Sequence, residues 1–293
     1  ASMVFTFRKE DVWSLYHSYQ FDFSVWELWG ALLHGGELVI AAESEVKDMA
    51  AFHRLCVRHG VSVLSQTPSA FYAFCELAAE RDTAVLNRLK YIIFGGEALQ
   101  PEQLSRWWHY AKRHGLRSQL VNMYGITETT VHVTYKVLSP TEAGATSNIG
   151  RPLEDLRAYV LDAHGNPVPI GVRGELYIGG AGLARGYLNQ PALTEARFVA
   201  NPFATELDKR KGYTRLYKTG DVVRWLPGGE LAYLGRNDFQ VKSRGYRIEL
   251  EEIERVLLSY EGIDQVGVLA KARQTEDETL SHYLVAYYVA TRS

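Results

Sequence analysis

The sequence predicts an α/β fold: a parallel sheet with covering helices, then a β-rich barrel-like subdomain, then a small, truncated α+β C-terminal subdomain. Strand-like segments alternate with helices of ten or more residues up to about residue 147. Short strands separated by HGNP, GG and PGGE turns then follow. After Gly235 a single helix and two strands form a third pattern. We therefore expect domains at 1–147, 148–237 and 238–293.

In the first region, apolar residues recur at either strand or helix spacing. The expected strands are 37–40, 61–65, 91–94 and 118–121. The expected helices are 48–59, 69–79 and 101–114, the last of which opens with a proline. Strands connected by helices of this length indicate a parallel sheet covered by helices.

The later regions are rich in short strands. We expect strands at 157–161, 174–178, 222–226 and 231–234 in the second region. In the third, we expect a helix at 250–259 and strands at 265–270 and 283–290.

Composition excludes several classes of protein. The chain has 293 residues, of which 46% are hydrophobic and 23% charged, with a net charge of −2. No basic field indicates nucleic acid or an anionic membrane, and the apolar stretch at 282–290 is far too short to cross a bilayer. Cys56 and Cys75 lack ligand spacing, so we interpret them as reduced core residues of a cytoplasmic protein.

Two polar segments follow predicted neighbouring strands, where open α/β sheets bind ligands. They are FGGEAL, residues 94–99, and NMYGITETT, residues 122–130. Glycines allow a flat ring to approach the backbone, a tyrosine can stack on it, and hydroxyl and carboxylate oxygens suit a phosphate and Mg²⁺. These segments predict a nucleotide site, although a threonine-rich turn that caps a helix is the alternative for 122–130. The residues are Gly95, Gly96, Glu97, Asn122, Tyr124, Thr127 and Glu128.

Three further stretches resemble the adenylate-forming superfamily, and more narrowly the adenylation domains of nonribosomal peptide synthetases. They are GELYIGGAGLARGYLNQPALTEARF (174–198), YKTGDVVRW (217–225) and GRNDFQVKSRGYRIELEEIE (235–254). FDFSVWELWGALLHGG (21–36) and NMYGITETT fit the same family in the same order. This resemblance implies that a substrate carboxylate attacks the α-phosphate of ATP. The acyl-adenylate then passes to the phosphopantetheine thiol of a carrier domain.

The resemblance also implies roles for individual residues. Glu128 would bind Mg²⁺ and Thr127 the α-phosphate, while Tyr124 would stack on adenine. Asp221 would hold the ribose hydroxyls, and Arg236 would contact the ribose or phosphate unless it is a surface arginine. Asp238 matches the family's hinge and Gly245 a loop that approaches the site in the second half-reaction; ordinary linker turns are the alternative for both.

Matching the family's pocket positions gives a set of residues that would read the substrate. Asp22 would pair with an α-ammonium group, because a carboxylate in an apolar pocket needs a cation. A helix N-cap is the alternative role for Asp22. The set is Asp22, Phe23, Trp26, Ser65, Ile93, Gly95, Met123, Val131 and His132.

The pocket residues indicate a small, hydroxylated amino acid. Phe23, Trp26 and Met123 are bulky, whereas Ser65 and His132 can hydrogen-bond a hydroxyl group, unless His132 is a satisfied core histidine. The set resembles the family's threonine pattern, except that Ser65 stands where that pattern usually has asparagine. Threonine is the predicted substrate; serine and modified threonines stay open.

Two parts of the family pattern are missing from the sequence. No Ser/Thr/Gly-rich phosphate loop precedes residues 21–36, and no C-terminal lysine of the family follows the strand at 283–290. We therefore expect a partial domain that binds its amino acid but turns over poorly alone. An acyl- or aryl-CoA ligase and a non-catalytic docking segment are the alternatives. The resemblance implies a carrier domain as partner and, in some members, an MbtH-like protein.

Overall fold

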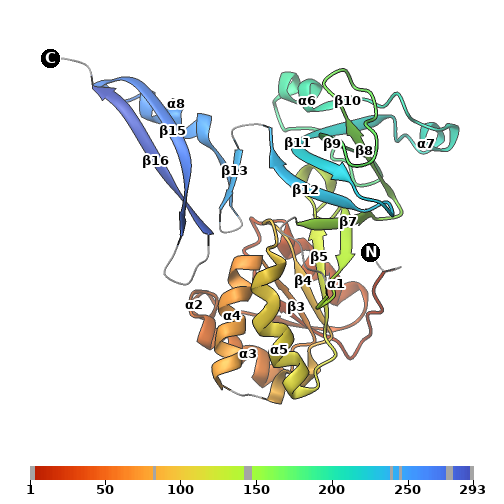
Figure 1. Ribbon diagram of the computed structural model, residues 1–293, viewed down its shortest axis with the longest axis vertical. Coiled ribbons are helices and arrows are strands. Elements are labelled where there is room, and N and C mark those ends of the chain that lie inside the picture. The colour runs from red at the N-terminus through yellow and green to blue at the C-terminus, as the bar shows by residue number, and fades with distance from the viewer. Residues whose placement is uncertain are drawn as a thin grey trace. The chain divides into compact units, whose positions relative to one another are not determined.

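The computed structural model describes residues 4–81, 84–141, 147–237, 240–243, 246–274 and 280–290. It divides into two compact units, Ala1–Gly235 and Arg236–Ser293 (Figure 1). The predicted α/β fold class is confirmed by the helices and the large sheet of the first unit. The predicted border between 147 and 148 lies within the first unit and stays a prediction.

Five parallel strands form the part of the sheet that carries the candidate site. Their order is β2-β1-β3-β4-β5, so β1 lies between β2 and β3 and the chain reverses direction across the sheet at β1. Such a reversal leaves a crevice at the carboxyl ends of the strands. The strands are β1 (Val12–Leu15), β2 (Glu37–Ile40), β3 (Val63–Gln66), β4 (Tyr91–Phe94) and β5 (Gln119–Tyr124).

Helices cover both faces of these strands. They are α1 (Phe23–Leu33), α2 (Glu43–Lys47), α3 (Met49–His59), α4 (Pro68–Arg81) and α5 (Ser105–His114), with 3-10 turns η1 (Ala84–Arg88), η2 (Pro101–Leu104) and η3 (Thr127–Thr129). The side chain of Asp48 caps α3 by accepting from the amide of Ala50 at 2.9 Å. Gly60 and Gly115 end α3 and α5 in left-handed conformations, with φ of 61° and 65°.

Side-chain alternation along the strands separates two cores. Leu64, Ile92 and Leu120 pack with α3, α4 and α5 on one face. Val63, Ile93 and Val121 pack with α1 on the opposite face. Figure 1 shows α3, α4 and α5 together on the near side of the strands. The period of two in these strands therefore decides which side chains face α1.

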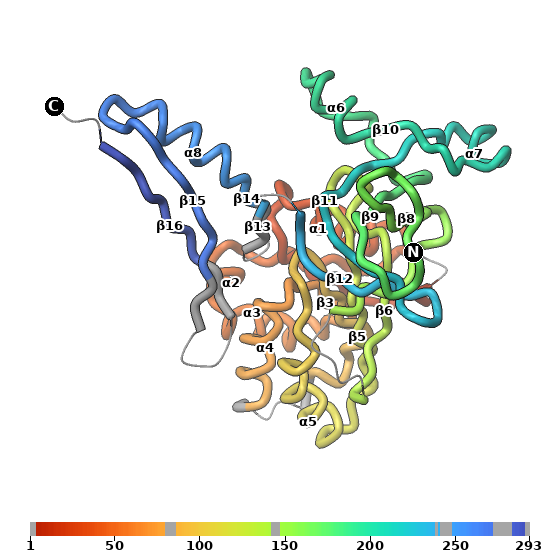
Figure 2. Tube along the Cα trace, turned by 45° about the horizontal axis from the view of Figure 1, so that its top comes forward, coloured from red at the N-terminus to blue at the C-terminus, as the bar shows by residue number. Residues whose placement is uncertain are grey.

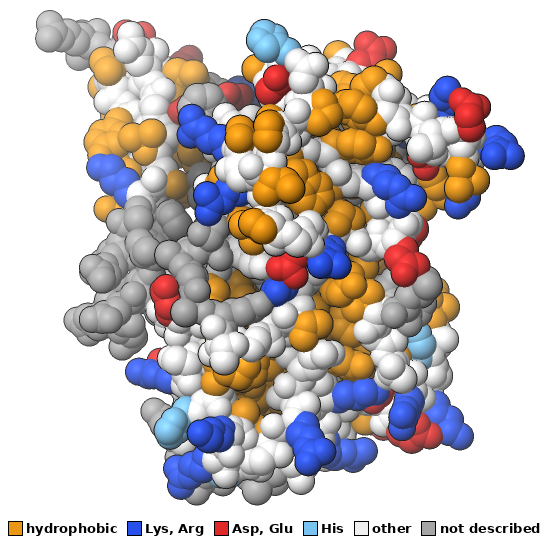
Figure 3. All heavy atoms as spheres, turned by 45° about the vertical axis from the view of Figure 1, so that its right-hand side comes forward, with side chains coloured by type: hydrophobic (Ala, Val, Ile, Leu, Met, Phe, Trp, Pro, Cys, Tyr) orange, Lys and Arg blue, Asp and Glu red, His pale blue; other side chains and the backbone are white. Residues whose placement is uncertain are grey.

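Basic residues lie in the last turns of α3 and α5. The last turn of α3 contains Arg58 and His59, and that of α5 contains Lys112, Arg113 and His114. Figure 3 shows Lys and Arg side chains gathered along the lower end of the first unit. Positive charge at a helix carboxyl end stabilises the helix dipole. These residues lie at the strand ends opposite the candidate site.

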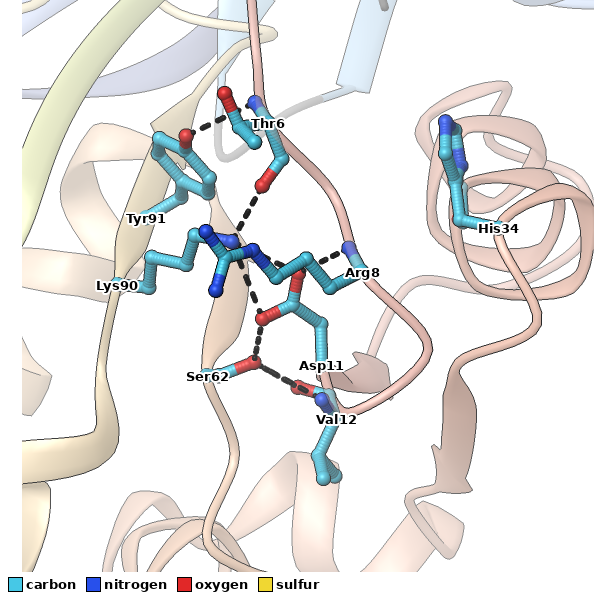
Figure 4. A network of polar contacts seen from close by, with 9 residues as sticks. Thr6, Arg8, Asp11, Val12, His34, Ser62, Lys90 and Tyr91 are labelled. Atoms are coloured by element: carbon cyan, nitrogen blue, oxygen red, sulfur yellow. Dashed lines mark hydrogen bonds and ion pairs between the residues drawn. The ribbon is translucent and has the colours of Figure 1, made fainter.

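The segment before β1 is attached to the sheet by the polar network in Figure 4. Lys90 Nζ donates to the Thr6 carbonyl and, at 3.0 Å, to Asp11 Oδ2. Ser62 Oγ donates to Asp11 Oδ1 at 3.2 Å and accepts from the Val12 amide at 2.9 Å. Asp11 is buried, so these donors replace the water that its carboxylate loses.

Antiparallel strands continue the sheet after β5. The order is β5-β6-β7-β12-β11-β9-β8, and β10 pairs with β11. The elements are β6 (Thr134–Val137), β7 (Asn148–Pro152), β8 (Leu156–Leu161), β9 (Arg173–Gly180), α6 (Pro191–Arg197), β10 (Phe198–Ala200), α7 (Glu206–Arg210), β11 (Arg215–Trp225) and β12 (Leu231–Arg236). Strand β11 begins well before the predicted start at 222, because it continues through a register shift between Lys218 and Val222.

The described residues of the second unit form two antiparallel strand pairs and a helix, which Figure 2 traces in blue. Its elements are β13 (Gln240–Ser243), β14 (Tyr246–Glu249), α8 (Leu250–Leu258), β15 (Ile263–Gln274) and β16 (Leu280–Ala290). The helix and both strands predicted for 250–290 are present. The predicted hinge residue Asp238 and the loop residue Gly245 lie outside the described residues. Across the described parts of the chain, we find no helix with the length and apolarity that membrane crossing requires.

Candidate functional site

The candidate site lies at the carboxyl ends of β1, β3, β4 and β5. Residues Gly95 and Gly96 follow β4 directly, and Tyr124 is the last residue of β5. Asn122 and Tyr124 were expected on a turn, but both belong to β5, which extends three residues beyond its predicted end. The turn begins at Gly125, and η3 contains Thr127 and Glu128.

Predicted pocket residues come together on the α1 face of the sheet. Ser65 and Ile93 are register partners on β3 and β4, and Met123 lies near the end of β5. A Cβ atom at Gly95 would lie 3.1 Å from the Phe23 ring and 3.4 Å from the His132 ring. The glycine therefore leaves room for both rings at the end of β4.

His132 lies against the aromatic rings that α1 contributes. Its ring centroid is 5.2 Å from that of Phe23 and 5.0 Å from that of Trp26, both edge-on. Burial lowers the pKa of His132 to about 3, so its imidazole is neutral near neutral pH. A neutral imidazole offers one hydrogen-bond donor and one acceptor.

A tight turn brings His132 back toward β5. Thr130 and Val131 both have left-handed backbones, with φ of 64° and 66°. The Val131 carbonyl approaches Gly125 so closely that a Cβ there would lie 1.8 Å from it. Left-handed geometry is unusual for a β-branched residue and often marks a functional loop.

Several buried polar atoms at the pocket have no hydrogen-bond partner within the described part of the chain. They are Ser65 Oγ, Trp26 Nε1 and both ring nitrogens of His132. Leaving such groups unpaired costs free energy, about 1–3 kcal/mol for each. A bound ligand that carries donors and acceptors would offset this cost. The satisfied core histidine, weighed as the alternative for His132, therefore does not fit ring nitrogens that lack a partner among the described residues.

Asp22 lies at the start of α1, next to Phe23. It is half-buried and occupies the N-cap position, but its side chain makes no capping hydrogen bond. Its backbone is helical, with φ −62° and ψ −16°, rather than extended as in most N-caps. Capping therefore does not account for this carboxylate.

Among the residues predicted to bind the nucleotide, Asp221 is fully buried and accepts hydrogen bonds from two tyrosines. Tyr124 Oη donates to Asp221 Oδ2 at 2.5 Å, and Tyr233 Oη donates to Oδ1 at 3.4 Å. Burial and then the negative charge of Asp221 raise the pKa of Tyr124 well above its ordinary value. The hydroxyl of Tyr124 thus remains protonated and fixes the carboxylate that would hold the ribose.

Glu128 is buried and also contacts two tyrosines. Its Oε1 accepts from Tyr187 Oη at 2.7 Å and from Tyr217 Oη at 3.0 Å. Burial is the main reason why the pKa of Tyr187 is raised, so its phenol stays protonated and can donate to Glu128. Within the described ranges, no three His, Cys, Asp or Glu side chains cluster as a metal site. A single carboxylate fits Mg²⁺ when phosphate oxygens and water complete its coordination.

The remaining predicted residues have mixed surroundings. Asn122 is buried, and its amide nitrogen donates to the Asn148 carbonyl at 2.8 Å. Glu97 accepts from the Ser69 amide at 3.2 Å, and Thr127 is exposed. Arg236 ends β12 and belongs to the second unit.

Sequence reasoning missed five side chains at the site. Tyr187, Tyr217 and Tyr233 lie in or near the quoted motifs but were given no role, and His17 and Glu27 were not considered. A single glutamate in the otherwise apolar segment FSVWELWGALL was a usable signal, because a buried carboxylate must have a partner.

Sequence comparisons place the chain among known proteins. A model of the family described as AMP-binding enzyme matches residues 1–188. The dimodular nonribosomal peptide synthase of Bacillus subtilis (strain 168) is 50% identical over 286 residues, which is 96% of this chain and 12% of that protein. Syringomycin synthase SyrB1 of Pseudomonas syringae pv. syringae is 44% identical over 257 residues, covering 87% of this chain and 40% of that protein.

Solved structures share the fold. Holo-PA1221, an NRPS protein that contains adenylation and PCP domains, superimposes with a TM-score of 0.82 at 29% identity, covering 98% of this chain and 47% of that one. The Vibrio cholerae adenylation domain AlmE, in complex with glycyl-adenosine-5'-phosphate, gives 0.78 at 29% identity and covers 98% and 51%. The chain therefore spans about half the length of these solved chains.

Proposed function

The chain belongs to the AMP-binding enzyme family, as an adenylation domain of the nonribosomal peptide synthetase type, and we propose that it activates L-threonine with ATP. The product is a threonyl-adenylate, which passes to the phosphopantetheine thiol of a carrier domain. The polar residues with the main roles in this proposal are Asp22, Thr127, Glu128 and Asp221.

One observation carries the choice of substrate: buried polar atoms lacking a partner among the described residues lie beside bulky apolar rings. Ser65 Oγ and the ring nitrogens of His132 can donate to and accept from a side-chain hydroxyl. Phe23 and Trp26 restrict the volume next to His132. A small hydroxylated side chain fits this combination, and the carboxylate of Asp22 suits its α-ammonium group.

The chemistry requires positioning and charge stabilisation more than a protein nucleophile. A carboxylate oxygen of threonine forms a bond to the α-phosphorus of ATP, and the bond from that phosphorus to the pyrophosphate oxygen breaks. Asp22 would orient the amino group, and Asp221, fixed by Tyr124, would accept hydrogen bonds from the ribose hydroxyls. Mg²⁺, held by Glu128 and the phosphates, would neutralise phosphate charge. Thr127, exposed at η3, would donate to an α-phosphate oxygen.

A carrier domain is the proposed acceptor of the threonyl group. The support comes from similar solved proteins that contain adenylation and PCP domains, among them PA1221 and the fused NpsA-ThdA. In this step the thiol loses its proton to water and its sulfur forms a bond to the carbonyl carbon of the adenylate, while the bond from that carbon to the phosphate oxygen breaks and AMP leaves. An MbtH-like partner is implied by the resemblance alone.

Calorimetric titration of the chain tests the proposal. With Mg·ATP present, threonine should bind, and valine should bind at least about tenfold more weakly, because it leaves the buried polar groups unpaired. Benzoate or a fatty acid binding better than threonine would indicate an acyl- or aryl-CoA ligase instead. A chain that binds neither ATP nor any acid would indicate a docking segment.

A further inference from the structure

A buried carboxylate and an imidazole form a pair behind the amino-acid pocket. Glu27 on α1 has no exposed side-chain surface, and only 6% of the His17 side chain is exposed. Glu27 Oε1 lies 3.0 Å from His17 Nδ1, and Oε2 accepts from the His17 amide at 3.1 Å. These donors replace the water that the buried carboxylate loses.

The pair lies where the sheet changes direction. His17 is two residues beyond the end of β1, the strand flanked by β2 and β3. Its ring lies against that of Phe23, with centroids 4.6 Å apart and planes 19° from parallel. The ring centroid of Phe23 in turn lies 5.2 Å from that of the predicted specificity residue His132. A continuous row of contacts thus runs from Glu27 through His17 and Phe23 to His132.

The hydrogen bond to Glu27 also determines how the His17 ring is oriented. A carboxylate that accepts from Nδ1 fixes the ring in one rotation and places the hydrogen on that nitrogen. Nε2 is buried and has no hydrogen-bond partner within the described residues. Neither His17 nor Glu27 has a role in the adenylation chemistry derived above.

We propose that His17 is a positioning residue of the amino-acid pocket, held in place by Glu27. Its ring supports Phe23 against His132 and so fixes the width of the cavity that receives the substrate side chain. This inference rests on the proposed function. If the support were lost, Phe23 could shift toward the vacated space, and the cavity would accept longer side chains.

Two variants separate ring support from the polar pair. His17→Asn keeps a side-chain donor near the place of Nδ1 but removes the ring. Combining His17→Phe with Glu27→Gln keeps the ring and removes the carboxylate–imidazole pair, while the amide oxygen introduced at position 27 can still accept from the backbone. Glu43→Gln, at an exposed carboxylate on α2, is the control for charge removal.

Calorimetry of the full chain with Mg·ATP gives the readout. We expect His17→Asn to weaken threonine binding by about tenfold and to lower the threonine-over-leucine ratio of affinities, with ATP affinity unchanged. The combined variant should keep that ratio within about twofold of the original chain. Circular dichroism confirms that each variant is folded.

The proposal fails if folded His17→Asn keeps both threonine affinity and selectivity. It also fails if the combined variant loses as much threonine affinity and selectivity as His17→Asn. Such a result would mean that the polar pair, and not the ring, determines threonine binding. NMR of the ligand-free chain supplies an independent measurement, since it should show the Nδ1–H tautomer of His17 and cross-relaxation between the His17 and Phe23 rings. A chain that shows this contact but binds no amino acid overturns the proposed function and this role together. A chain that binds threonine without the contact overturns this role alone.

Discussion

Tyr124, at the end of β5, donates its hydroxyl hydrogen to the fully buried carboxylate of Asp221 at 2.5 Å. The two residues are 97 positions apart in the chain. This contact connects the parallel strands to β11, and it orients the group proposed to hold the ribose. We therefore expect loss of this hydrogen bond to affect both the stability of the fold and the binding of the nucleotide.

Tyr124→Phe should weaken both properties. Asp221 would lose one donor while staying buried, which should lower the free energy of unfolding by about 1–3 kcal/mol. ATP affinity should fall by about tenfold, because the carboxylate is no longer fixed. Urea unfolding and ATP calorimetry measure the two effects. Tyr159→Phe, at a half-buried tyrosine outside the site, is the control, and an unchanged ATP affinity in Tyr124→Phe would contradict the assigned role of Asp221.

Asp22→Asn should remove most of the affinity for threonine. Truncating the charged partner of an ammonium group in a desolvated pocket costs about 2–5 kcal/mol of binding. ATP binding should be nearly unchanged, which calorimetry with each ligand separately would show. The exposed carboxylate of Asp155 provides the matched control, Asp155→Asn. Equal threonine binding in Asp22→Asn and the original chain would refute the ammonium site.

His132→Phe should make stability less dependent on acidic pH. In the unfolded chain His132 takes up a proton near its ordinary pKa of 6.5, whereas burial lowers that pKa to about 3 in the folded chain. Acidification between these values therefore favours the unfolded chain, and the stability present above about 6.5 is lost toward about 3. The slope of the free energy of unfolding against pH should decrease by at most about 1.4 kcal/mol per pH unit in the variant. Urea unfolding at several pH values measures it.

A histidine at an exposed position supplies the comparison for this pH series. His109→Phe should leave the slope as it is in the original chain, because His109 is exposed. If His132→Phe and His109→Phe gave equal slopes, the neutral state assigned to His132 would be wrong.

Lys90→Met should destabilise the first unit without changing the pocket. The substitution removes the cation beside buried Asp11, and partial exposure of Lys90 moderates the cost to about 1–3 kcal/mol. Lys47→Met breaks an exposed ion pair with Glu43, which water and salt screen, and should lower the free energy of unfolding much less than Lys90→Met. Chemical unfolding measures both, and threonine calorimetry should be unaffected in each. A smaller loss in Lys90→Met than in Lys47→Met would contradict the network in Figure 4.

The parallel strands were predictable because their signals are local. The strands at 37–40 and 91–94 have the predicted bounds, and α3 (Met49–His59) begins one residue after the predicted start of the helix at 48–59. Strand β1 and helix α1 were not predicted. The segment FSVWELWGALL is apolar around most of its circumference, so its helical period is weak.

The site was predictable where residues lie in motifs and missed where tertiary contacts decide. Ser65, Ile93 and Met123 were expected from the family resemblance, and the strand order and side-chain alternation of the sheet bring them to the α1 face. The links from Tyr187 and Tyr217 to Glu128 join segments that lie 59 and 89 positions apart in the chain. No periodicity in the sequence encodes such a contact.

The left-handed backbone at Val131 also bears on redesign of substrate choice. A β-branched residue at φ 66° holds local strain, and glycine or asparagine would relieve it. The neighbouring carbonyl is held close to Gly125, so the turn has little freedom to relax by moving. Replacing Val131 by glycine or asparagine would therefore relieve backbone strain, whereas isoleucine or threonine, being β-branched, would keep it.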